Sequence, residues 1–160
     1  MSIEEKIEKK YFFKNSVHIL LAHSYIFYFI GFLAGIFLDF IFSFDAFGQF
    51  YIMKIIGCVL IILSTILIFW AQKTSRNFKN DIVTKETFSK GPYRFIQNPT
   101  DWGVFLLILG FGIIANAIFV VLCTLFSFFA SRFFFLRKQD SILTKKYGIP
   151  FTEYKKSVEL

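Results

Sequence analysis

Three long apolar stretches limit what this chain can fold into. Residues 17–42, 51–71 and 102–136 are almost continuously hydrophobic, with only isolated polar residues inside them. A helix needs about 20 apolar residues to cross a bilayer core of about 30 Å, so each of the first two runs is long enough. Over the whole chain 56% of residues are hydrophobic and 25 are Phe, an apolar share above that of soluble domains. The sequence therefore predicts an all-α, polytopic membrane protein.

The third run needs a reversal, because one helix over its whole length would be about 50 Å long. Gly110, Gly112 and residues 115–117 offer a break near its middle. We therefore predict a C-terminal helical hairpin with arms at about 102–114 and 117–138. The shorter arm can cross only if it begins below the headgroups or if the bilayer thins around it.

The domain organisation follows from these runs. We predict a single integral membrane domain over residues 1–160, with two transmembrane helices at 17–42 and 51–71 followed by the hairpin. The polar segments 72–101 and 139–160 are left to form a site outside the apolar core. Apolar residues at four-residue spacing before residue 15 suggest an amphipathic helix on the membrane surface, and a solvated leader is an equal alternative.

The cations predict a topology. Of the 18 Lys and Arg residues, all but Lys54 precede the first run, lie in residues 72–101, or stand at or beyond the end of the third run. By the positive-inside rule, both termini and the 72–101 loop are cytoplasmic. This distribution accounts for the net charge of +7 without a nucleic-acid partner, and it favours contact with anionic lipid.

Polar residues within the first run suggest packing rather than metal chemistry. His18 and His23 are five positions apart and do not share a helical face, so no metal site is predicted. Gly31 and Gly35 form a GxxxG pair, which predicts the close approach of another helix. We expect Asp39, near the outer end of the run, to reach water.

Two polar segments flank the hairpin. In the first, Gly91 and Pro92 predict a tight turn, and Pro99 biases Asn98 away from helical geometry. A conformationally fixed segment at the lip of a membrane helix suits a binding site, although a helix-entry loop at the headgroup level is the simpler alternative. In the second, residues 137–158 predict a helix that Gly148 ends, with an amphipathic tail as the alternative.

Taken together, these two segments resemble the isoprenylcysteine carboxyl methyltransferase family, which is related to membrane phospholipid methyltransferases. The chain reads GPYRFIQNP at residues 91–99, then has the hairpin, then reads QDSILTKKYG at residues 139–148, followed by Tyr154. The resemblance covers about the last 75 residues. The chain departs from the family pattern at Gln97 in place of Arg, Asn98 in place of His, Thr100-Asp101 in place of Met-Tyr, and Gln139-Asp140 in place of Glu-Glu.

The resemblance implies S-adenosylmethionine-dependent methyl transfer to a lipid-like or prenylcysteine-like acceptor at the cytoplasmic membrane face. A lipophilic acceptor would enter sideways from the bilayer. By the resemblance, Arg94 binds the cofactor carboxylate or braces the loop. The candidate cofactor-binding residues are Tyr93, Arg94, Gln97, Asn98, Pro99, Asp101, Gln139 and Asp140, and no catalytic group is identified.

Two other functions stay open. The charges missing at Gln97 and Gln139 favour a non-catalytic membrane scaffold or lipid-binding protein that keeps the fold. Some membrane sterol reductases share an Arg-x-x-Arg-His-Pro-type segment near their C terminus. They are much longer, and this sequence shows no second nucleotide-binding element.

Overall fold

A computed structural model of the protein describes residues 3–42, 51–77 and 90–157. These residues form a bundle of long helices. No strand occurs within these ranges. The helices are α1 (Ile3–Phe42), α2 (Tyr51–Asn77), the 3-10 turn η1 (Gly91–Arg94), α4 (Pro99–Ile114), α5 (Ile118–Ser131), the π-helical turn η2 (Arg132–Leu136), α6 (Arg137–Tyr147) and α7 (Ile149–Ser157). The all-α prediction is confirmed.

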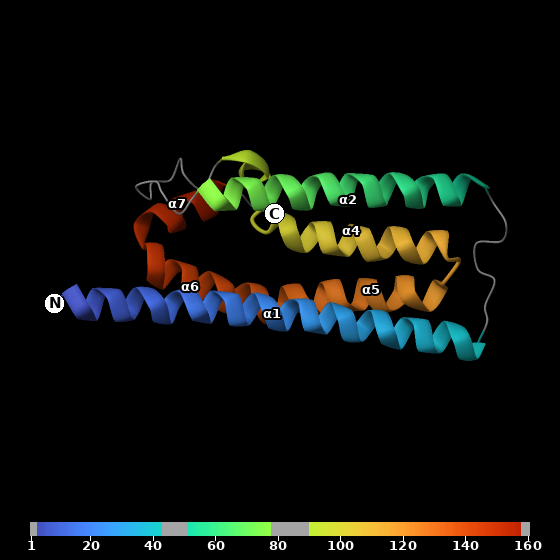
Figure 1. Ribbon diagram of the computed structural model, residues 1–160, viewed down its shortest axis with the longest axis horizontal. Coiled ribbons are helices and arrows are strands. Elements are labelled where there is room, and N and C mark those ends of the chain that lie inside the picture. The colour runs from blue at the N-terminus through green and yellow to red at the C-terminus, as the bar shows by residue number, and fades with distance from the viewer. Residues whose placement is uncertain (1–2, 43–50, 78–89, 158–160) are drawn as a thin grey trace.

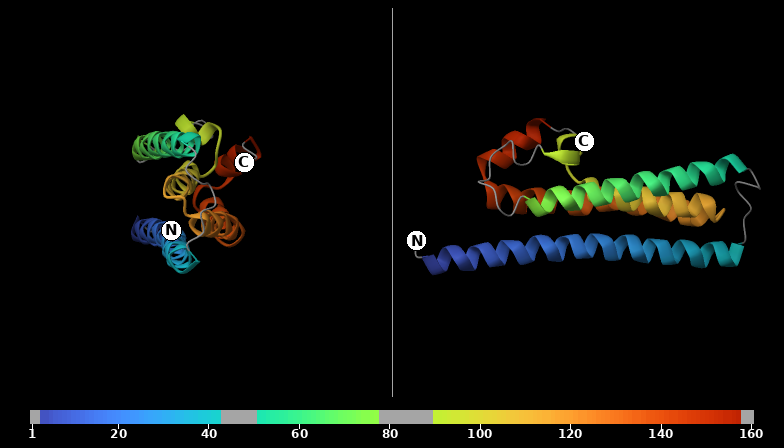
Figure 2. Two further views of the ribbon diagram at one scale, coloured as in Figure 1. Left: turned by 90° about the vertical axis from the view of Figure 1, so that its right-hand side faces the viewer. Right: turned by 45° about the horizontal axis from the view of Figure 1, so that its top comes forward.

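The helices pair within the bundle. α2 packs chiefly against α4, α1 packs chiefly against α5, and α4 and α5 join the two pairs as a hairpin (Figures 1 and 2). The α4–α5 turn lies at the same end of the bundle as the end of α1 and the start of α2 (Figure 1). The opposite end carries η1, the start of α4, and α6 with α7. The two polar segments of the sequence are thus at one end of the bundle.

The hairpin turn lies where the sequence places it. Asn116 adopts a left-handed φ of 57° between α4 and α5, a geometry that Asn tolerates better than most residues. Backbone N–H groups of Ala115 and Ala117 donate to the carbonyls of Phe111 and Gly112, at 2.9 and 2.8 Å, which satisfies the end of α4. The two predicted hairpin glycines, Gly110 and Gly112, lie within α4 and are buried.

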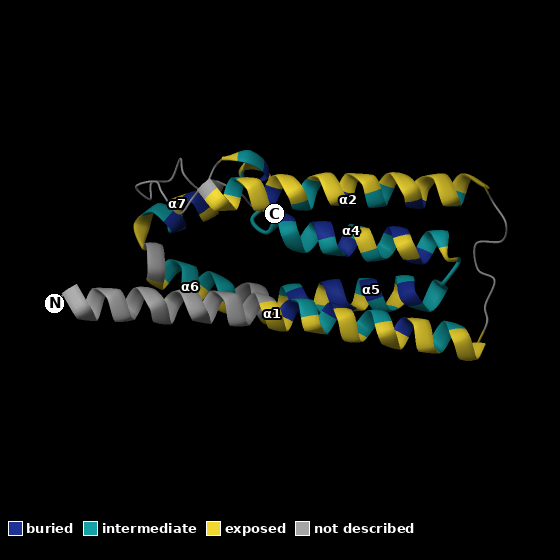
Figure 3. Ribbon diagram, in the orientation of Figure 1, coloured by how far each residue is buried: buried dark blue, intermediate teal, exposed yellow. Residues whose placement is uncertain are grey.

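Three helical segments are long and apolar enough to cross a membrane: Ala22–Phe42, Tyr51–Arg76 and Ile118–Lys145. α4 has 16 residues, about 24 Å of helix, and is shorter than a bilayer core. Exposed apolar side chains cover the outward faces of the bundle, among them Phe40 and Phe126, which are 84% and 70% exposed (Figure 3). Such surfaces require lipid around them. The membrane boundaries and the side on which the termini lie stay predictions.

Four element boundaries differ from the sequence analysis. α2 continues to Asn77, past the predicted end at residue 71, and α4 begins at Pro99, before the predicted start at about residue 102. α1 runs without a break from residue 3, so the expected separate leader helix is continuous with the first span. The reason is that residues 3–30 contain no Gly or Pro to end a helix. The second hairpin arm was predicted as one helix, but α5 ends at Ser131 and continues through η2 into α6. π-turns of this kind occur often at functional sites.

Small residues set the distance between α1 and α5, as the GxxxG pair predicts. A Cβ added at Gly31 would lie 2.2 Å from the Ser127 Oγ, and one added at Gly35 would lie 2.6 Å from the Val120 Cα. The second of these contacts is with backbone, which cannot rotate away. Gly57 and Gly110 play the same part between α2 and α4, where each added Cβ would lie 2.8 Å from the other residue's carbonyl oxygen. Helix pairs in membranes commonly pack through such small residues.

The sequence predicts that Asp39 reaches water. In the structure its carboxylate instead contacts the backbone of α5. Its carboxylate is half-buried and accepts the backbone N–H groups of Phe119 and Val120, at 3.1 and 2.9 Å. These N–H groups belong to the first turn of α5 and have no partner within their own helix. An acidic group at a helix N-terminus also interacts favourably with the helix dipole. A side chain of α1 therefore caps α5 and fixes the register of this helix pair.

We predict that Gly35→Leu destabilises the bundle, because the new side chain would meet the α5 backbone. Overpacking at such a contact costs about 1–3 kcal/mol. The matched control is Ala34→Leu, which adds bulk to the exposed face of the same helix. Thermal unfolding in detergent, followed by circular dichroism, should show a lower midpoint for Gly35→Leu only. Equal midpoints for the two variants would contradict the close packing.

We also predict that Asp39→Ala destabilises the protein by about 1–2 kcal/mol, since it removes the cap of α5. Asp39→Asn keeps one side-chain oxygen as an acceptor and should lose roughly half as much. The same thermal unfolding measurement gives the order wild type, Asn, Ala. If Asn and Ala behave like wild type, the carboxylate does not cap α5.

Candidate functional site

η1 opens the first polar segment and explains its glycine and proline. Gly91 has a φ of +62°, which glycine adopts without strain, and an added Cβ there would lie 2.5 Å from the Thr74 Oγ1 of α2. Pro92 is fully buried, and its carbonyl accepts the backbone N–H groups of Phe95 and Ile96, both at 3.1 Å. The predicted tight turn is therefore a short 3-10 helix held against the end of α2.

The start of α4 brings the two polar segments together. Asn98 has non-helical backbone angles and precedes Pro99 at the first helical position, as the sequence predicts. The Asn98 side-chain amide donates from Nδ2 to the Oε1 of Gln139 on α6, at 3.1 Å. Both side chains are half-buried. Residues 41 positions apart in the chain thus meet at one end of the bundle.

The C-terminal helix α7 closes over η1. The Tyr154 hydroxyl donates to the Tyr93 backbone carbonyl at 2.6 Å, and Tyr154 packs against Phe151. Burial raises the pKa of the Tyr154 hydroxyl above its ordinary value, so this group stays protonated and able to donate at neutral pH. Burial likewise raises the pKa of Tyr93, whose hydroxyl interacts with Ser75 of α2 and Thr100 of α4. Tyr93 therefore links α2, α4 and α7.

Asp140 and Arg94 lie toward the surface of this region. The Asp140 carboxylate forms an ion pair with the Nζ of Lys155 on α7. Arg94 is exposed, and its guanidinium lies 5.9 Å from the centroid of the exposed Phe95 ring. Among the described contacts, none joins Arg94 to Asn98, Gln139 or Asp140. Gln97 is half-buried and Pro99 is fully buried beside them.

Asp101 faces a different group of side chains, inside the bundle. Its carboxylate oxygens lie 3.4 Å from the Ser24 Oγ and 3.4 Å from the Tyr28 hydroxyl, both on α1. Ser24 is also hydrogen-bonded to Ser131 of α5 at 2.9 Å. Arg132, the next residue, places its guanidinium 5.9 Å from the Trp102 ring centroid. We call Ser24, Tyr28, Asp101, Ser131 and Arg132 the interior polar cluster.

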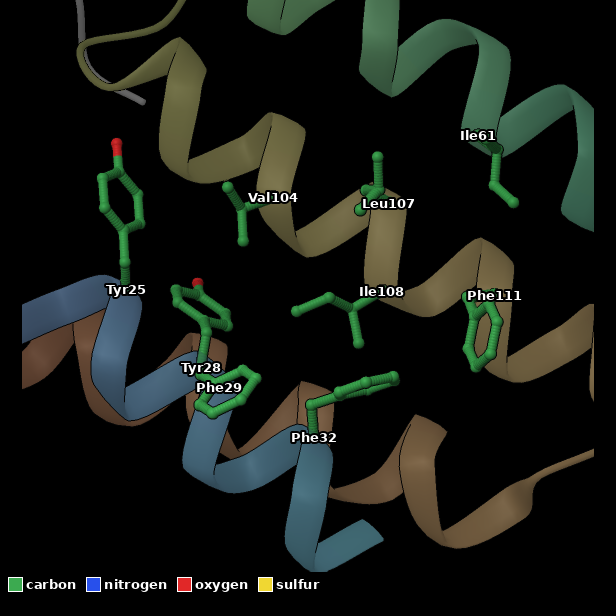
Figure 4. A pocket seen from close by; sticks show the side chains of 9 residues that line it. All are labelled: Tyr25, Tyr28, Phe29, Phe32, Ile61, Val104, Leu107, Ile108 and Phe111. Carbon is green, nitrogen blue, oxygen red and sulfur yellow. The ribbon is translucent and has the colours of Figure 1, made fainter. Parts of the chain in front are cut away.

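An apolar cavity of about 500 Å³ borders the interior polar cluster through one shared residue, Tyr28. α1, α2 and α4 line it, with Tyr25 and Tyr28 toward the start of α4 and Phe111 at the other end (Figure 4). Phe29 and Phe111 are 59% and 45% exposed, so its wall includes the lipid-facing surface. The cavity is therefore apolar along its length and reaches the outer surface of the bundle, a lining that suits a hydrocarbon chain.

The structure does not bring all eight predicted site residues into one group. Asn98 donates a hydrogen bond to Gln139. Tyr93 and Asp140 contact α7 through Tyr154 and Lys155. Asp101 faces the interior polar cluster instead. Sequence reasoning missed Ser24, Tyr28 and Ser131, because a lone hydroxyl in an apolar run carries little signal. Arg132 did carry a signal: an ionisable residue inside a membrane helix is rare and usually functional.

Within the described residues, no group of three or more His, Cys, Asp and Glu side chains is arranged to hold a metal ion. The polar groups at this end of the bundle are instead amides, hydroxyls, carboxylates and cations. These groups suit hydrogen bonding to an organic cofactor or a lipid head.

Comparison with known proteins identifies the family. A family model described as phospholipid methyltransferase matches residues 52–149, which include nearly all of α2 and all of η1, α4, α5, η2 and α6. No curated protein and no solved structure matches the chain. The matched range covers more than half of the sequence and contains the first polar segment and the start of the second, with both Asn98 and Gln139. The chain belongs to the phospholipid methyltransferase family.

Proposed function

We propose that this protein transfers a methyl group from S-adenosylmethionine to a lipid-like or prenylcysteine-like acceptor at the cytoplasmic face of a membrane. The observation that carries the proposal is the hydrogen bond between Asn98 and Gln139. It unites, in a chain of a methyltransferase family, the two segments that the sequence analysis assigned to cofactor binding.

The residues at this end of the bundle fit such a cofactor. Its ribose hydroxyls need acceptors, which the Asp140 carboxylate and the amide oxygens of Asn98 and Gln139 supply. The Asn98 amide donates one N–H to Gln139, and it carries a second N–H for a ligand. The cofactor carboxylate needs a cation, and Lys155, which pairs with Asp140, is one candidate. Arg94 is a second candidate if its exposed side chain turns inward.

The bound cofactor would supply an electrophilic methyl group on a sulfonium. Displacement at such a carbon needs donor and nucleophile in line, and it needs water kept out. Two features of the chain serve these needs. The hydrogen bond from the Tyr154 hydroxyl to the Tyr93 carbonyl holds α7 against η1. The apolar cavity gives a lipophilic acceptor a path from the bilayer.

The orientation rests on charge. The end of the bundle that carries η1, α6 and α7 is also the end at which most Lys and Arg residues lie in the sequence. The positive-inside rule therefore favours a cytoplasmic site with access to a soluble cofactor.

Calorimetric titration of S-adenosylhomocysteine into the detergent-purified protein tests the cofactor. We expect binding to wild type and a roughly 10- to 100-fold weaker affinity for Asn98→Ala, which loses the amide contacts. Asp140→Ala should weaken binding by a similar factor. Glu153→Gln is the control, because it removes one exposed charge from α7 and should bind as wild type does.

The contrary result is equally clear. If millimolar S-adenosylhomocysteine gives no heat while the protein keeps its helical circular dichroism, the cofactor assignment is wrong. The non-catalytic alternative, a lipid-binding scaffold on the same fold, would then take its place. Transfer of radiolabelled methyl groups to membrane extracts would in turn identify the acceptor of an active protein.

A further inference from the structure

A basic and aromatic surface lies at the site end of the bundle, where the end of α2 meets η1 (Figure 1). Its side chains come from the last turns of α2, from η1 and from the residue that follows η1. All of them are exposed, and Phe69 and Phe95 expose 69% and 63% of their surface. We call this surface the α2–η1 patch, and its members are Phe69, Trp70, Lys73, Arg76, Arg94 and Phe95.

One face of α2 changes from apolar to cationic along its length. The spacing of four and three residues places one stripe of side chains on this face, and all are exposed: Ile62, Ile66, Phe69, Lys73 and Arg76. The isoleucines belong to a segment that is long and apolar enough to cross a membrane, so lipid tails cover them. The stripe therefore passes from hydrocarbon, through an aromatic ring, to two cations.

The rise of the helix places these cations at the depth of lipid phosphates. At about 1.5 Å per residue, Lys73 and Arg76 lie about 6 and 10 Å beyond Phe69. Interfacial aromatic rings mark the edge of the hydrocarbon core, and the headgroup layer outside it is about 5–8 Å thick. The long side chains of Lys and Arg can bend back over the few Å that remain.

η1 adds a charge of the same sign beside α2. Gly91 packs so closely on α2 that an added Cβ would lie 2.5 Å from the Thr74 Oγ1, and the Tyr93 hydroxyl interacts with Ser75. Arg94 ends this turn, and its guanidinium lies 5.9 Å from the Phe95 ring centroid. When η1 packs on α2, like charges are therefore carried on neighbouring elements, and they repel each other.

No acid within the two segments offsets this repulsion. Residues 69–77 and 90–95 contain no Asp or Glu, whereas Lys155 on α7 has a carboxylate partner in Asp140. An anion bound from outside would offset it, and the exposed rings of the patch need hydrocarbon beside that anion. A lipid with a net negative head supplies both. A zwitterionic head carries its own cation and gives no net attraction to a basic surface.

We propose that the α2–η1 patch binds the heads of anionic phospholipids and that this binding holds η1 against α2. Lys73 and Arg76 contact the head phosphates from α2, and Arg94 contacts them from η1. Because η1 carries the Tyr93 carbonyl that accepts the Tyr154 hydroxyl, bound lipid also stabilises the position of α7. Lipid binding at this surface requires neither a methyl donor nor an acceptor.

Lipid retention tests the binding. Protein in maltoside micelles with equal amounts of phosphatidylglycerol and phosphatidylcholine is transferred to native mass spectrometry, where the retained lipids are counted. We expect wild type to prefer phosphatidylglycerol by about 20-fold, and Lys73→Gln and Arg76→Gln each to lower the preference about fivefold. Lys54→Gln is the matched control, because it removes an exposed cation from the opposite end of α2 and should keep the preference.

Hydrogen–deuterium exchange tests whether the lipid holds η1. The backbone N–H groups of Phe95 and Ile96 both donate to the Pro92 carbonyl at 3.1 Å. In nanodiscs, replacing a third of the phosphatidylcholine by phosphatidylglycerol should slow exchange of these two amides about tenfold. The double variant Lys73→Gln/Arg76→Gln should lose this effect. The amides of Ala115 and Ala117 in the hairpin turn are the internal reference and should not respond.

Four results would overturn the proposal. One is equal retention of the two lipids by wild type, and another is an equal loss of preference in Lys54→Gln and Lys73→Gln. The third is exchange at Phe95 and Ile96 that does not respond to phosphatidylglycerol, or that slows no more than exchange in the hairpin turn. The fourth is equal slowing by millimolar inorganic phosphate in detergent, which would make the patch a site for free anions. Neither measurement uses a cofactor, so a failed titration of S-adenosylhomocysteine would leave their outcome unchanged.

Discussion

The reversal of the chain between α4 and α5 is the constraint on which the rest of the structure depends. A turn of three residues around Asn116, in left-handed geometry, makes the two helices antiparallel neighbours. The end of the hairpin far from the turn must then bring the start of α4 beside the α5–α6 junction. Asn98 and Gln139 meet there, and so do Trp102 and Arg132. Both the candidate cofactor site and the interior polar cluster are products of this one fold-back.

Close packing between neighbouring helices stabilises the hairpin within the bundle. Gly35 lets α1 approach the α5 backbone, and Gly57 with Gly110 lets α2 approach α4. Between such closely spaced helices, the Asp39 carboxylate reaches the first turn of α5, and Ser24 reaches Ser131. In a lipid environment, apolar burial gives little drive for helix association, so van der Waals contact and these interhelical hydrogen bonds carry the assembly.

The two ends of the bundle differ in what their polar groups do. Far from the site, Asp39 caps α5 with two good hydrogen bonds, at 3.1 and 2.9 Å. At the site end, among the described residues, Asp101 has two hydroxyl contacts at 3.4 Å and Arg132 lies against the rings of Trp102 and Phe128. The first carboxylate holds a helix end, whereas the second has longer contacts to hydroxyl groups of α1.

The sequence by itself determined the class of fold, the hairpin and the place of its break, because run length and the conformational preference of Asn116 act locally. It also determined that Asn98 precedes a helix and that Gly148 ends one, and its paired segments pointed to a methyltransferase family. Tertiary structure alone decided which of the eight candidate residues meet. Asp101 turned to α1, Arg94 to the surface, and Asp140 to Lys155. Those partners lie on other helices, and no spacing along one chain can specify which faces of packed helices come together.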